Sequence, residues 1–316
     1  MSDRLPPLTA LRAFEAAARH LSFAKAADEL NVTPAALSFQ IKSLEEHLGA
    51  PVFRRLNRAV ELTEAGRTLS PGTSEGFARL TTAWRNTQRI SDNTTLTVTA
   101  GPAFTAKWLA PRLYEFAQAH PEIDLRLTAG LRIMDFDRDE VDLAIRFGYG
   151  PDDGLHSTPL AREWVTPVMT PELAQKYDTP AKLANAPLIH DDSINFLHNP
   201  CDWPAWFRAI KIAADTSHGP RFSQADHAID AALAGAGIVL ARVTLAHKDI
   251  LSGRLVAPFK TAISTTAQFR FLCPLGNETR PNIAAFRDWV LKQADPIKTV
   301  GRNRQLIAAA DIPPPQ

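Results

Sequence analysis

Two groups of side chains in this sequence could recognise or transform a ligand. The first is a run of arginines: residues 54–89 contain seven arginines and three glutamates, a charge of +4 (7 − 3), in a chain whose net charge is only +1. A local positive segment of this kind suits contact with phosphates. A solvated, arginine-rich helix face would have the same composition. The segment alone therefore does not distinguish a phosphate-binding surface from a solvated one.

The second group consists of histidines and carboxylates in the second half of the chain. His190, Asp191, Asp192 and His198 could ligate a metal, but their spacing matches no ligand pattern at helical register. The sequence contains no G-x-S-x-G motif, no phosphate-binding loop and no pairing of a cysteine nucleophile with a histidine. We therefore expect neither an enzyme nor a bound cofactor or metal.

Composition restricts the class of protein further. The two cysteines, Cys201 and Cys273, exclude a disulfide scaffold and a four-thiolate zinc site, and free thiols fit a reducing cytosol. A redox-sensing pair 72 residues apart in sequence is the less favoured alternative. The first residues contain no apolar stretch typical of a secretory signal, and no run approaches 18 apolar residues. We expect a cytoplasmic protein that does not span a membrane.

The elements around the arginines predict a compact helical unit with a wing. Thr33 as N-cap and Pro34 at the first helical position open a helix that Gly49 ends. A shorter helix precedes it and ends at Asn31 in the left-handed conformation, so the two predict a helix-turn-helix. Residues 52–62 alternate around an asparagine-containing turn, which predicts a β-hairpin.

The longer helix of this pair has the width that fits the major groove of B-DNA. Its outward side chains can contact thymine methyls and phosphates, and arginines of the wing can reach the backbone or the minor groove. A plain helical bundle, in which Thr33-Pro34 is only a cap, is the alternative. The expected DNA contacts are Thr33, Pro34, Ala35, Ser38, Phe39, Lys42, Arg54, Arg55 and Arg58.

A long amphipathic helix follows the wing and ends near residues 91–93, where the pattern changes. Its apolar stripe consists of Leu69, Phe77, Leu80 and Trp84. This stripe is too apolar for a lone exposed helix, so we expect a partner chain to cover it. Beyond residue 93, apolar strands alternate with amphipathic helices, which is typical of parallel sheets covered on both faces. The last residues, 297–316, end in a proline-rich stretch and are expected to be disordered.

Residues 8–66 resemble the DNA-binding domain of the LysR-type transcriptional regulators nearly end to end. The matching stretches are LTALRAFEAAA (8–18), LSFAKAADEL (21–30), TPAALSFQIKSLE (33–45) and the wing from Leu48 to Gly66. Further along, Pro111–Leu113, His120–Ile123 and Asp142–Gly148 resemble the effector domain of that family. LIHDD (188–192) and GAGIVL (235–240) are similar to the subgroup that contains the glycine-cleavage activator and the β-lactamase-gene regulator.

The resemblance implies a multidomain chain with an all-α winged helix-turn-helix, a linker helix, and an α/β effector domain of two lobes like a periplasmic binding protein. The expected ranges are 1–66 for the DNA-binding domain, 67–92 for the linker or dimerisation helix, and 93–296 for the effector domain, with lobe I at 94–165 and 268–295 and lobe II at 166–267.

The same resemblance implies a regulator that binds double-stranded operator DNA as a homodimer or homotetramer. A small-molecule co-inducer, carboxylate or amino-acid-like, and RNA polymerase are the further expected partners. A periplasmic-type solute-binding protein and a DNA-binding protein without a ligand are the alternatives. Phe39 departs from the family, because many members place a polar or basic side chain there and phenylalanine cannot pair bidentately with guanine.

In a two-lobed α/β body, ligands bind in the cleft at the carboxyl ends of strands. The loop after the first strand offers backbone amides and the Thr105 hydroxyl to an anion, although Thr105 could simply cap a helix. Arg146 closes a strand and could meet a carboxylate of the effector, or instead pair with Asp142 or Glu140. The expected effector contacts are Pro102, Ala103, Phe104, Thr105, Arg146, Ser193, Phe222, Gln224 and Asp226.

Overall fold

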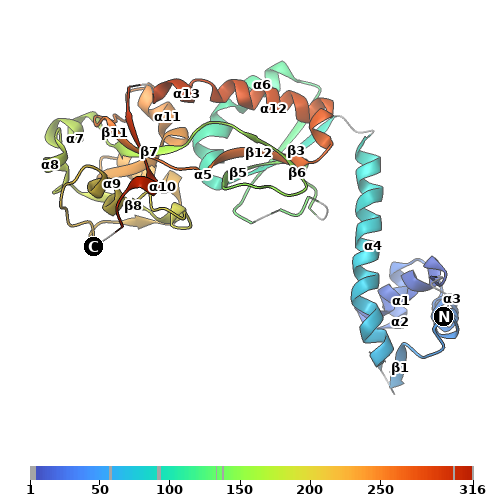
Figure 1. Ribbon diagram of the computed structural model, residues 1–316. Coiled ribbons are helices and arrows are strands. Elements are labelled where there is room, and N and C mark those ends of the chain that lie inside the picture. Colours follow the sequence, from blue (N-terminus) through green and yellow to red (C-terminus); the bar gives the residue numbers. More distant parts are fainter. Residues whose placement is uncertain are drawn as a thin grey trace. The chain divides into compact units, whose positions relative to one another are not determined.

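The computed structural model describes residues 5–56, 59–90, 94–132, 134–136, 139–301 and 303–314. The chain forms two compact units, Met1–Ser91 and Asp92–Gln316 (Figure 1). In the described residues, no helix has the length and apolar character needed to cross a bilayer.

The first unit is a winged helix-turn-helix followed by a long helix. Its elements are α1 (Leu8–His20), α2 (Phe23–Glu29), α3 (Pro34–Leu48), β1 (Phe53–Leu56), β2 (Ala59–Leu62) and α4 (Glu64–Ile90). The predicted caps are confirmed: the Thr33 hydroxyl accepts a hydrogen bond from the backbone of Ala36, and Gly49 ends α3 at φ +76°. Asn31 adopts the predicted left-handed conformation, at φ +53°. The predicted hairpin is also confirmed, with β1 and β2 antiparallel.

The core of this unit explains why α4 is only partly exposed. Phe14 and Leu37 are buried between the helices of the first unit, and Leu69 and Phe77 of α4 pack partly against that core. Leu80 and Trp84 do not, and they are 56% and 66% exposed. The apolar stripe of α4 is therefore divided between the unit's own core and an uncovered surface.

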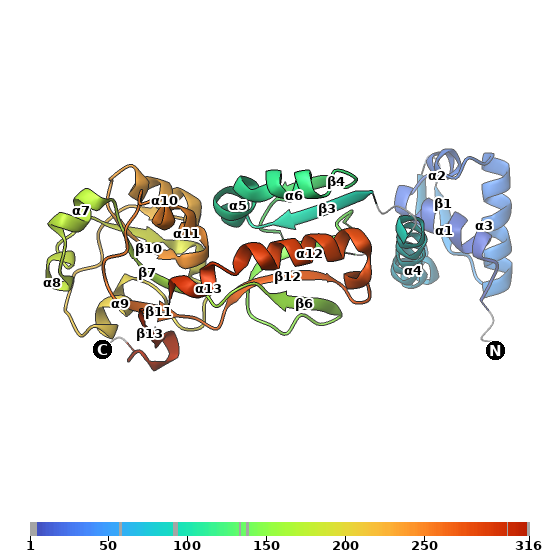
Figure 2. The same ribbon diagram turned by 90° about the horizontal axis from the view of Figure 1, so that it is seen from above.

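The second unit contains two sheets, which define two lobes (Figures 1 and 2). The first lobe has the strand order β4-β3-β5-β12-β6 and the second lobe the order β13-β11-β7-β10-β8-β9. The strands of the first lobe are β3 (Thr95–Ala100), β4 (Asp124–Ala129), β5 (Leu143–Gly148), β6 (Leu155–Pro159) and β12 (Gln268–Pro274). Those of the second lobe are β7 (Trp164–Val168), β8 (Leu188–Asp191), β9 (Arg221–Phe222), β10 (Ile238–Arg242), β11 (Thr261–Ser264) and β13 (Gln305–Ala308).

The expectation of parallel sheets is met only in part, because both sheets mix parallel pairs with antiparallel ones. β12 runs antiparallel to β5 and to β6, and β7 runs antiparallel to β10 and to β11. The chain passes from the first lobe to the second after β6, returns after β11, and crosses again after β12 to reach β13. Strands that carry the chain out and back must point in opposite directions, so these crossings impose the antiparallel pairs.

Helices cover the sheets of both lobes. In the first lobe, α6 (Leu113–Ala119) and α12 (Pro281–Ala294) lie side by side (Figures 1 and 2), and the rings of Phe116 and Phe286 meet with centroids 5.2 Å apart. The other helical segments up to residue 294 are α5 (Pro102–Phe104), a π-helical turn η1 (Thr105–Leu109), η2 (Ala110–Arg112), α7 (Pro171–Lys176), α8 (Pro180–Leu183), η3 (Asp192–Ile194), α9 (Trp203–Ala209), α10 (Ala225–Leu233), α11 (Val243–Leu251) and η4 (Asn277–Thr279).

The expectation that residues 297–316 are disordered is wrong for the part that the structure describes. α13 (Ile297–Val300) is followed by β13, which pairs in parallel with β11, and then by η5 (Ala309–Asp311). Arg304 donates to the carbonyl of Phe259 and lies 5.3 Å from the ring centre of Trp164. A four-residue strand needs a partner strand to form, so it leaves little signal beside the prolines that follow it.

Candidate functional site

The outward face of α3 is exposed in the first unit. Thr33, Pro34, Ala35, Phe39 and Lys42 are exposed, and Ser38 is half-buried. Phe39 differs from these neighbours because it is a large apolar side chain with 68% of its surface open. An apolar ring at the centre of a polar helix face gains contact energy only when another molecule covers it.

The arginines of the wing follow this helix in the sequence. Arg54 of β1 is exposed and lies opposite Glu61 of β2 in the antiparallel register. The backbone of Arg55 pairs with Val60. The side chain of Arg55 and the whole of Arg58 lie outside the described residues.

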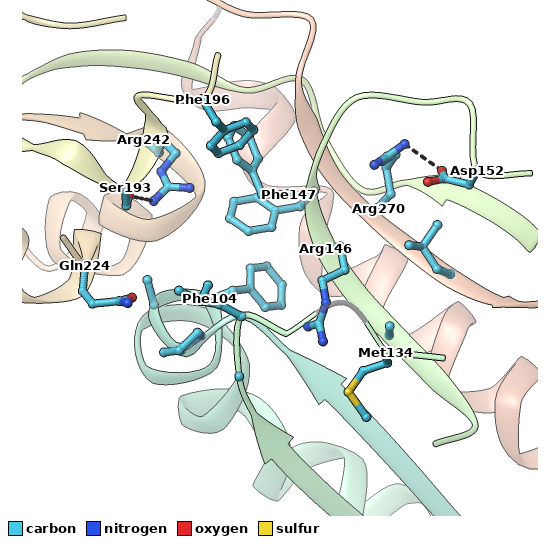
Figure 3. A pocket seen from close by; sticks show the side chains of 18 of the residues that line it. Phe104, Met134, Arg146, Phe147, Asp152, Ser193, Phe196, Gln224, Arg242 and Arg270 are labelled. Atoms are coloured by element: carbon cyan, nitrogen blue, oxygen red, sulfur yellow. Dashed lines mark hydrogen bonds and ion pairs between the residues drawn. The ribbon is translucent and has the colours of Figure 1, made fainter. Parts of the chain in front are cut away.

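A cavity of about 630 Å³ lies between the two lobes of the second unit (Figure 3). The first lobe contributes the loop at the start of α5 and residues of β5 and β12. The second lobe contributes side chains that follow β8 and β9, and Arg242 at the end of β10. The predicted effector contacts that line it are Pro102, Ala103, Phe104, Arg146, Ser193 and Gln224. This volume is within the range of small-molecule binding sites.

Two arginines of the first lobe lie on neighbouring strands in this cavity. Arg146 of β5 and Arg270 of β12 are paired in the antiparallel register, and both line the cavity. Like charges at directly opposed positions repel each other. Arg270 is neutralised, since its Nη1 donates to Asp152 Oδ2 at 2.7 Å (Figure 3).

Arg146 has no acidic partner in the described part of the chain. It donates to the carbonyls of Ile145 and Arg132 and to the hydroxyl of Thr99, all of which are neutral. The alternative pairing with Asp142 is not formed, because that carboxylate accepts from Arg280 and from the backbone of Thr97. Burial lowers the pKa of Arg146 below its ordinary value. Among the described residues, the cavity therefore carries an uncompensated positive charge.

A third arginine of the cavity comes from the second lobe. Arg242, at the end of β10, donates to the Ser193 hydroxyl at 2.9 Å and lies 3.7 Å from a carboxylate oxygen of Asp191. Its guanidinium lies 4.9 Å from the ring centre of Phe147 of the first lobe. Arg242 therefore joins the two lobes and is already paired with an acid.

Three predicted effector contacts do not line the cavity. Thr105 lies in the π-helical turn, and its hydroxyl is buried without a hydrogen-bond partner in the described structure. Phe222 pairs with Asp191 at the sheet edge and packs partly against the core. Asp226 lies in the first turn of α10, and its Oδ1 is buried and has no partner among the described residues.

Sequence reasoning missed several lining residues. Those from strands and loops include Leu131, Met134, Phe136, Phe147, Asp152, Phe196, Arg242, Phe269 and Arg270. An arginine inside or at the end of an otherwise apolar strand, as in β10 and β12, is a signal that could have identified Arg242 and Arg270. The aromatic residues gave no such signal, because a core phenylalanine has the same sequence context.

Most of the candidate metal and redox residues are hydrogen-bonded within the protein or buried. The His190 imidazole lies 2.9 Å from the carbonyl of His218, and Asp192 accepts from Arg221. Within the described ranges no group of three or more histidines, cysteines and carboxylates could hold a metal. Cys201 and Cys273 are free and buried, and burial raises the pKa of each thiol to about 12, so neither is a reactive thiolate.

A winged helix-turn-helix joined to a two-lobed α/β unit with a cavity between its lobes defines a ligand-responsive DNA-binding regulator. Residues 8–67 match the family described as "Bacterial regulatory helix-turn-helix protein, lysR family", and residues 90–295 match "LysR substrate binding domain". The chain belongs to the LysR family of transcriptional regulators, as its motifs predicted.

Individual relatives agree with this assignment. The chain is 42% identical over 298 residues to the glycine cleavage system transcriptional activator of Escherichia coli K12, covering 93% of this chain and 96% of that protein. It is 37% identical to the transcriptional activator AmpR of Pseudomonas aeruginosa, over 91% of this chain and 96% of AmpR. The solved effector domain of that AmpR superposes with a TM-score of 0.53 at 30% identity, covering 65% of this chain and 97% of that domain.

Proposed function

We propose that this LysR-type regulator responds to a small anionic metabolite bound in the cavity between the lobes. The observation that carries the proposal is the Arg146 guanidinium, which lines the cavity and meets no carboxylate in the described structure. Arg146 is half-buried, and a charge withdrawn from water costs free energy unless a counter-charge reaches it. An anionic ligand supplies that counter-charge, and hydrogen bonds to charged groups contribute about 1.5–3 kcal/mol each.

The DNA side of the proposal assigns operator contacts to the first unit. The exposed α3 residues Thr33, Pro34, Ala35, Phe39 and Lys42, together with Ser38, would face the major groove, and Arg54, Arg55 and Arg58 would contact the backbone from the wing. Phe39 would contact a thymine methyl or a sugar rather than guanine. The operator sequence would then differ from those read by a polar side chain at this position.

LysR regulators form oligomers, and for this chain we assign a homodimer or homotetramer in the cytoplasm, with RNA polymerase as a further partner. The uncovered surface of α4, which includes Leu80 and Trp84, supports a contact between copies. An apolar groove of about 840 Å³ next to it is lined by Leu8, Leu48 and Phe77, among others.

The proposal is tested on an operator fragment found by footprinting the DNA that flanks the gene. Fluorescence anisotropy measures operator affinity with and without small organic anions selected by thermal shift. We expect one such anion to shift the affinity of the wild type and of Arg126→Gln, which changes an exposed arginine of β4. Arg146→Gln should lose the shift. An equal change of operator affinity in Arg146→Gln would show that the effector binds elsewhere.

A further inference from the structure

We propose that the effector is an aryl monocarboxylate, a planar apolar body that carries one carboxylate and no ammonium group. This inference deepens the proposed function and rests on it, because it assumes that an anion binds at Arg146. It follows from three properties of the cavity: the number of free cations, the state of its acids, and the arrangement of its aromatic rings.

The cavity offers one uncompensated cation among its described lining residues. Arg270 is paired with Asp152 at 2.7 Å, and Arg242 lies 3.7 Å from Asp191. Both arginines have little exposed side chain, 9% for Arg270 and 6% for Arg242. Within the described lining, Arg146 alone meets only neutral acceptors. A second carboxylate on the ligand would have to compete with an existing ion pair, so the cavity favours one carboxylate.

The acids of the cavity already compensate cations of the protein itself. Asp152 is the one carboxylate among the described lining residues, and the same oxygen accepts from Arg270 and from the Ser157 hydroxyl. Asp191, behind Arg242, accepts from the backbone of Ser193. An α-amino acid would bring its ammonium group near Arg146, where no free acid of the described residues compensates it. The cavity therefore disfavours a zwitterion.

A row of aromatic rings defines the apolar part of the site. Phe104 and Phe269 meet with ring centres 4.6 Å apart, Phe269 and Phe147 at 5.0 Å, and Phe147 and Phe196 at 6.1 Å. Figure 3 shows Phe104 and Phe147 close to Arg146, with Phe196 of the second lobe beyond them.

The second lobe adds Phe196 to this row of rings. Phe196 is 53% exposed, so this ring has surface left for a ligand to cover. Aromatic groups pair by offset stacking or edge-to-face contact with centres about 4.5–7 Å apart, a geometry that this row continues. An aryl ring of the effector would contact both lobes, while its carboxylate meets Arg146 of the first.

The test is calorimetry on the full-length protein with a matched set of probes. The reference probe is 3-phenylpropionate. L-Phenylalanine adds only an α-ammonium group to it, and 2-benzylsuccinate adds a second carboxylate arm. 3-Phenylpropionamide removes the charge, and butyrate replaces the ring by a methyl group. We expect 3-phenylpropionate to bind at least about tenfold more tightly than each of the other four, the size of effect of one charge-assisted hydrogen bond or one buried ring.

Variants separate this inference from the proposed function. Arg146→Gln should weaken binding of 3-phenylpropionate by about tenfold or more, and Arg146→Lys should restore part of the loss. Phe196→Ala should weaken it by about threefold to tenfold. Arg126→Gln, the matched exposed arginine, should bind as the wild type does. Melting temperatures of all variants establish that each one is folded.

The outcomes fall into two groups. If L-phenylalanine, 2-benzylsuccinate or butyrate binds as tightly as 3-phenylpropionate and loses affinity in Arg146→Gln, the ligand class is wrong and the anion site stands. The class is equally wrong if 3-phenylpropionate shows no saturable binding at millimolar concentration. If 3-phenylpropionate binds with unchanged affinity in Arg146→Gln, the anion site itself is overturned.

Discussion

Glu163 is a fully buried carboxyl that lies where the chain crosses from β6 to β7. Its Oε1 accepts from the backbones of Trp164 and Thr244 at 3.3 and 3.2 Å. Its Oε2 has no partner in the described structure. Burial raises the pKa of Glu163 to about 7, opposed by hydrogen bonding to Thr244, by the charge of Arg242 and by the backbone of Trp164. The carboxyl therefore titrates near neutral pH.

Glu163→Gln should remove a pH dependence of stability. The folded-state pKa, about 7, is above the ordinary value of 4.5, so the folded chain holds more protons than the unfolded chain between these values. The free energy of unfolding then falls as pH rises through this window, by about 3 kcal/mol in total. Urea unfolding from about pH 5 to about pH 8 should show this fall in the wild type and a flatter profile in Glu163→Gln.

The control for this experiment is Glu75→Gln, which changes an exposed glutamate of α4. Its profile should match that of the wild type. If Glu163→Gln keeps the full decline in stability towards the alkaline end of the range, the titrating group is elsewhere in the chain.

A second prediction at this scale concerns the wing. Arg54 is exposed and can reach a phosphate, so Arg54→Ala should weaken operator binding at every salt concentration. One lost phosphate contact lowers the slope of log affinity against log salt by about one. A salt titration by fluorescence anisotropy measures that slope, with Arg126→Ala of the second unit as the control. An unchanged slope in Arg54→Ala would show that Arg54 does not contact the operator phosphates.

At the scale of elements, local chemistry made the first unit predictable. Thr33, Pro34 and Gly49 each fix a helix end through their own side chain or backbone, so α3 could be predicted from short-range sequence alone. The directions of β7 and β12 could not be predicted from the sequence, because strand direction depends on how the chain crosses between the lobes. β13 was missed for a related reason: it begins at Gln305, whereas its partner β11 begins far earlier in the sequence, at Thr261.

The candidate site was predictable in part for the same physical reason. Arg146 could be predicted because it lies near the end of an apolar strand, a position that opens on a cleft in α/β folds. The cross-strand position of Arg146 opposite Arg270 could not be predicted, because strand neighbours that are distant in sequence leave no local pattern. The loop after β3 predicts Thr105 as an effector contact, because it offers free backbone amides and this hydroxyl to an anion. The structure has a π-helical turn there, and the buried hydroxyl does not line the cavity.

The prediction at the scale of elements concerns the uncovered part of α4 and the association of two copies of the chain. Leu80 and Trp84 are exposed although both are large and apolar, so a second copy of the chain should cover them. Replacing both by glutamate would bury charge in that contact and should shift the full-length protein towards monomer in sedimentation velocity at micromolar concentration. Ala78→Glu, on a different side of α4, should sediment as the wild type does. Unchanged sedimentation of the double variant would exclude this surface from the interface.

At the scale of the whole molecule, a regulator needs two binding events that influence each other. An effector shifts operator affinity only as far as it binds the two states of the protein differently. The cavity takes side chains from both lobes, so its ligand contacts depend on how the lobes meet. Besides the rings and Arg242, an ion pair joins the lobes directly: Lys107 Nζ of the π-helical turn lies 2.5 Å from Asp230 Oδ1 of α10.

Asp230→Asn should therefore weaken effector binding without touching the cavity. The lysine side chain is 12% exposed and the aspartate side chain 63%, so the pair is partly open to solvent. Measured pairs of this kind contribute about 0.2–1 kcal/mol, so the expected loss of effector affinity is about 1.4-fold to fivefold. Calorimetry with the effector measures it, and Asp124→Asn, which breaks an exposed pair within the first lobe, is the control. The double variant Lys107→Met/Asp230→Asn should lose no more than Asp230→Asn alone, because both changes remove the same contact. Additive losses, or wild-type affinity in Asp230→Asn, would show that this ion pair does not hold the lobes in the binding conformation.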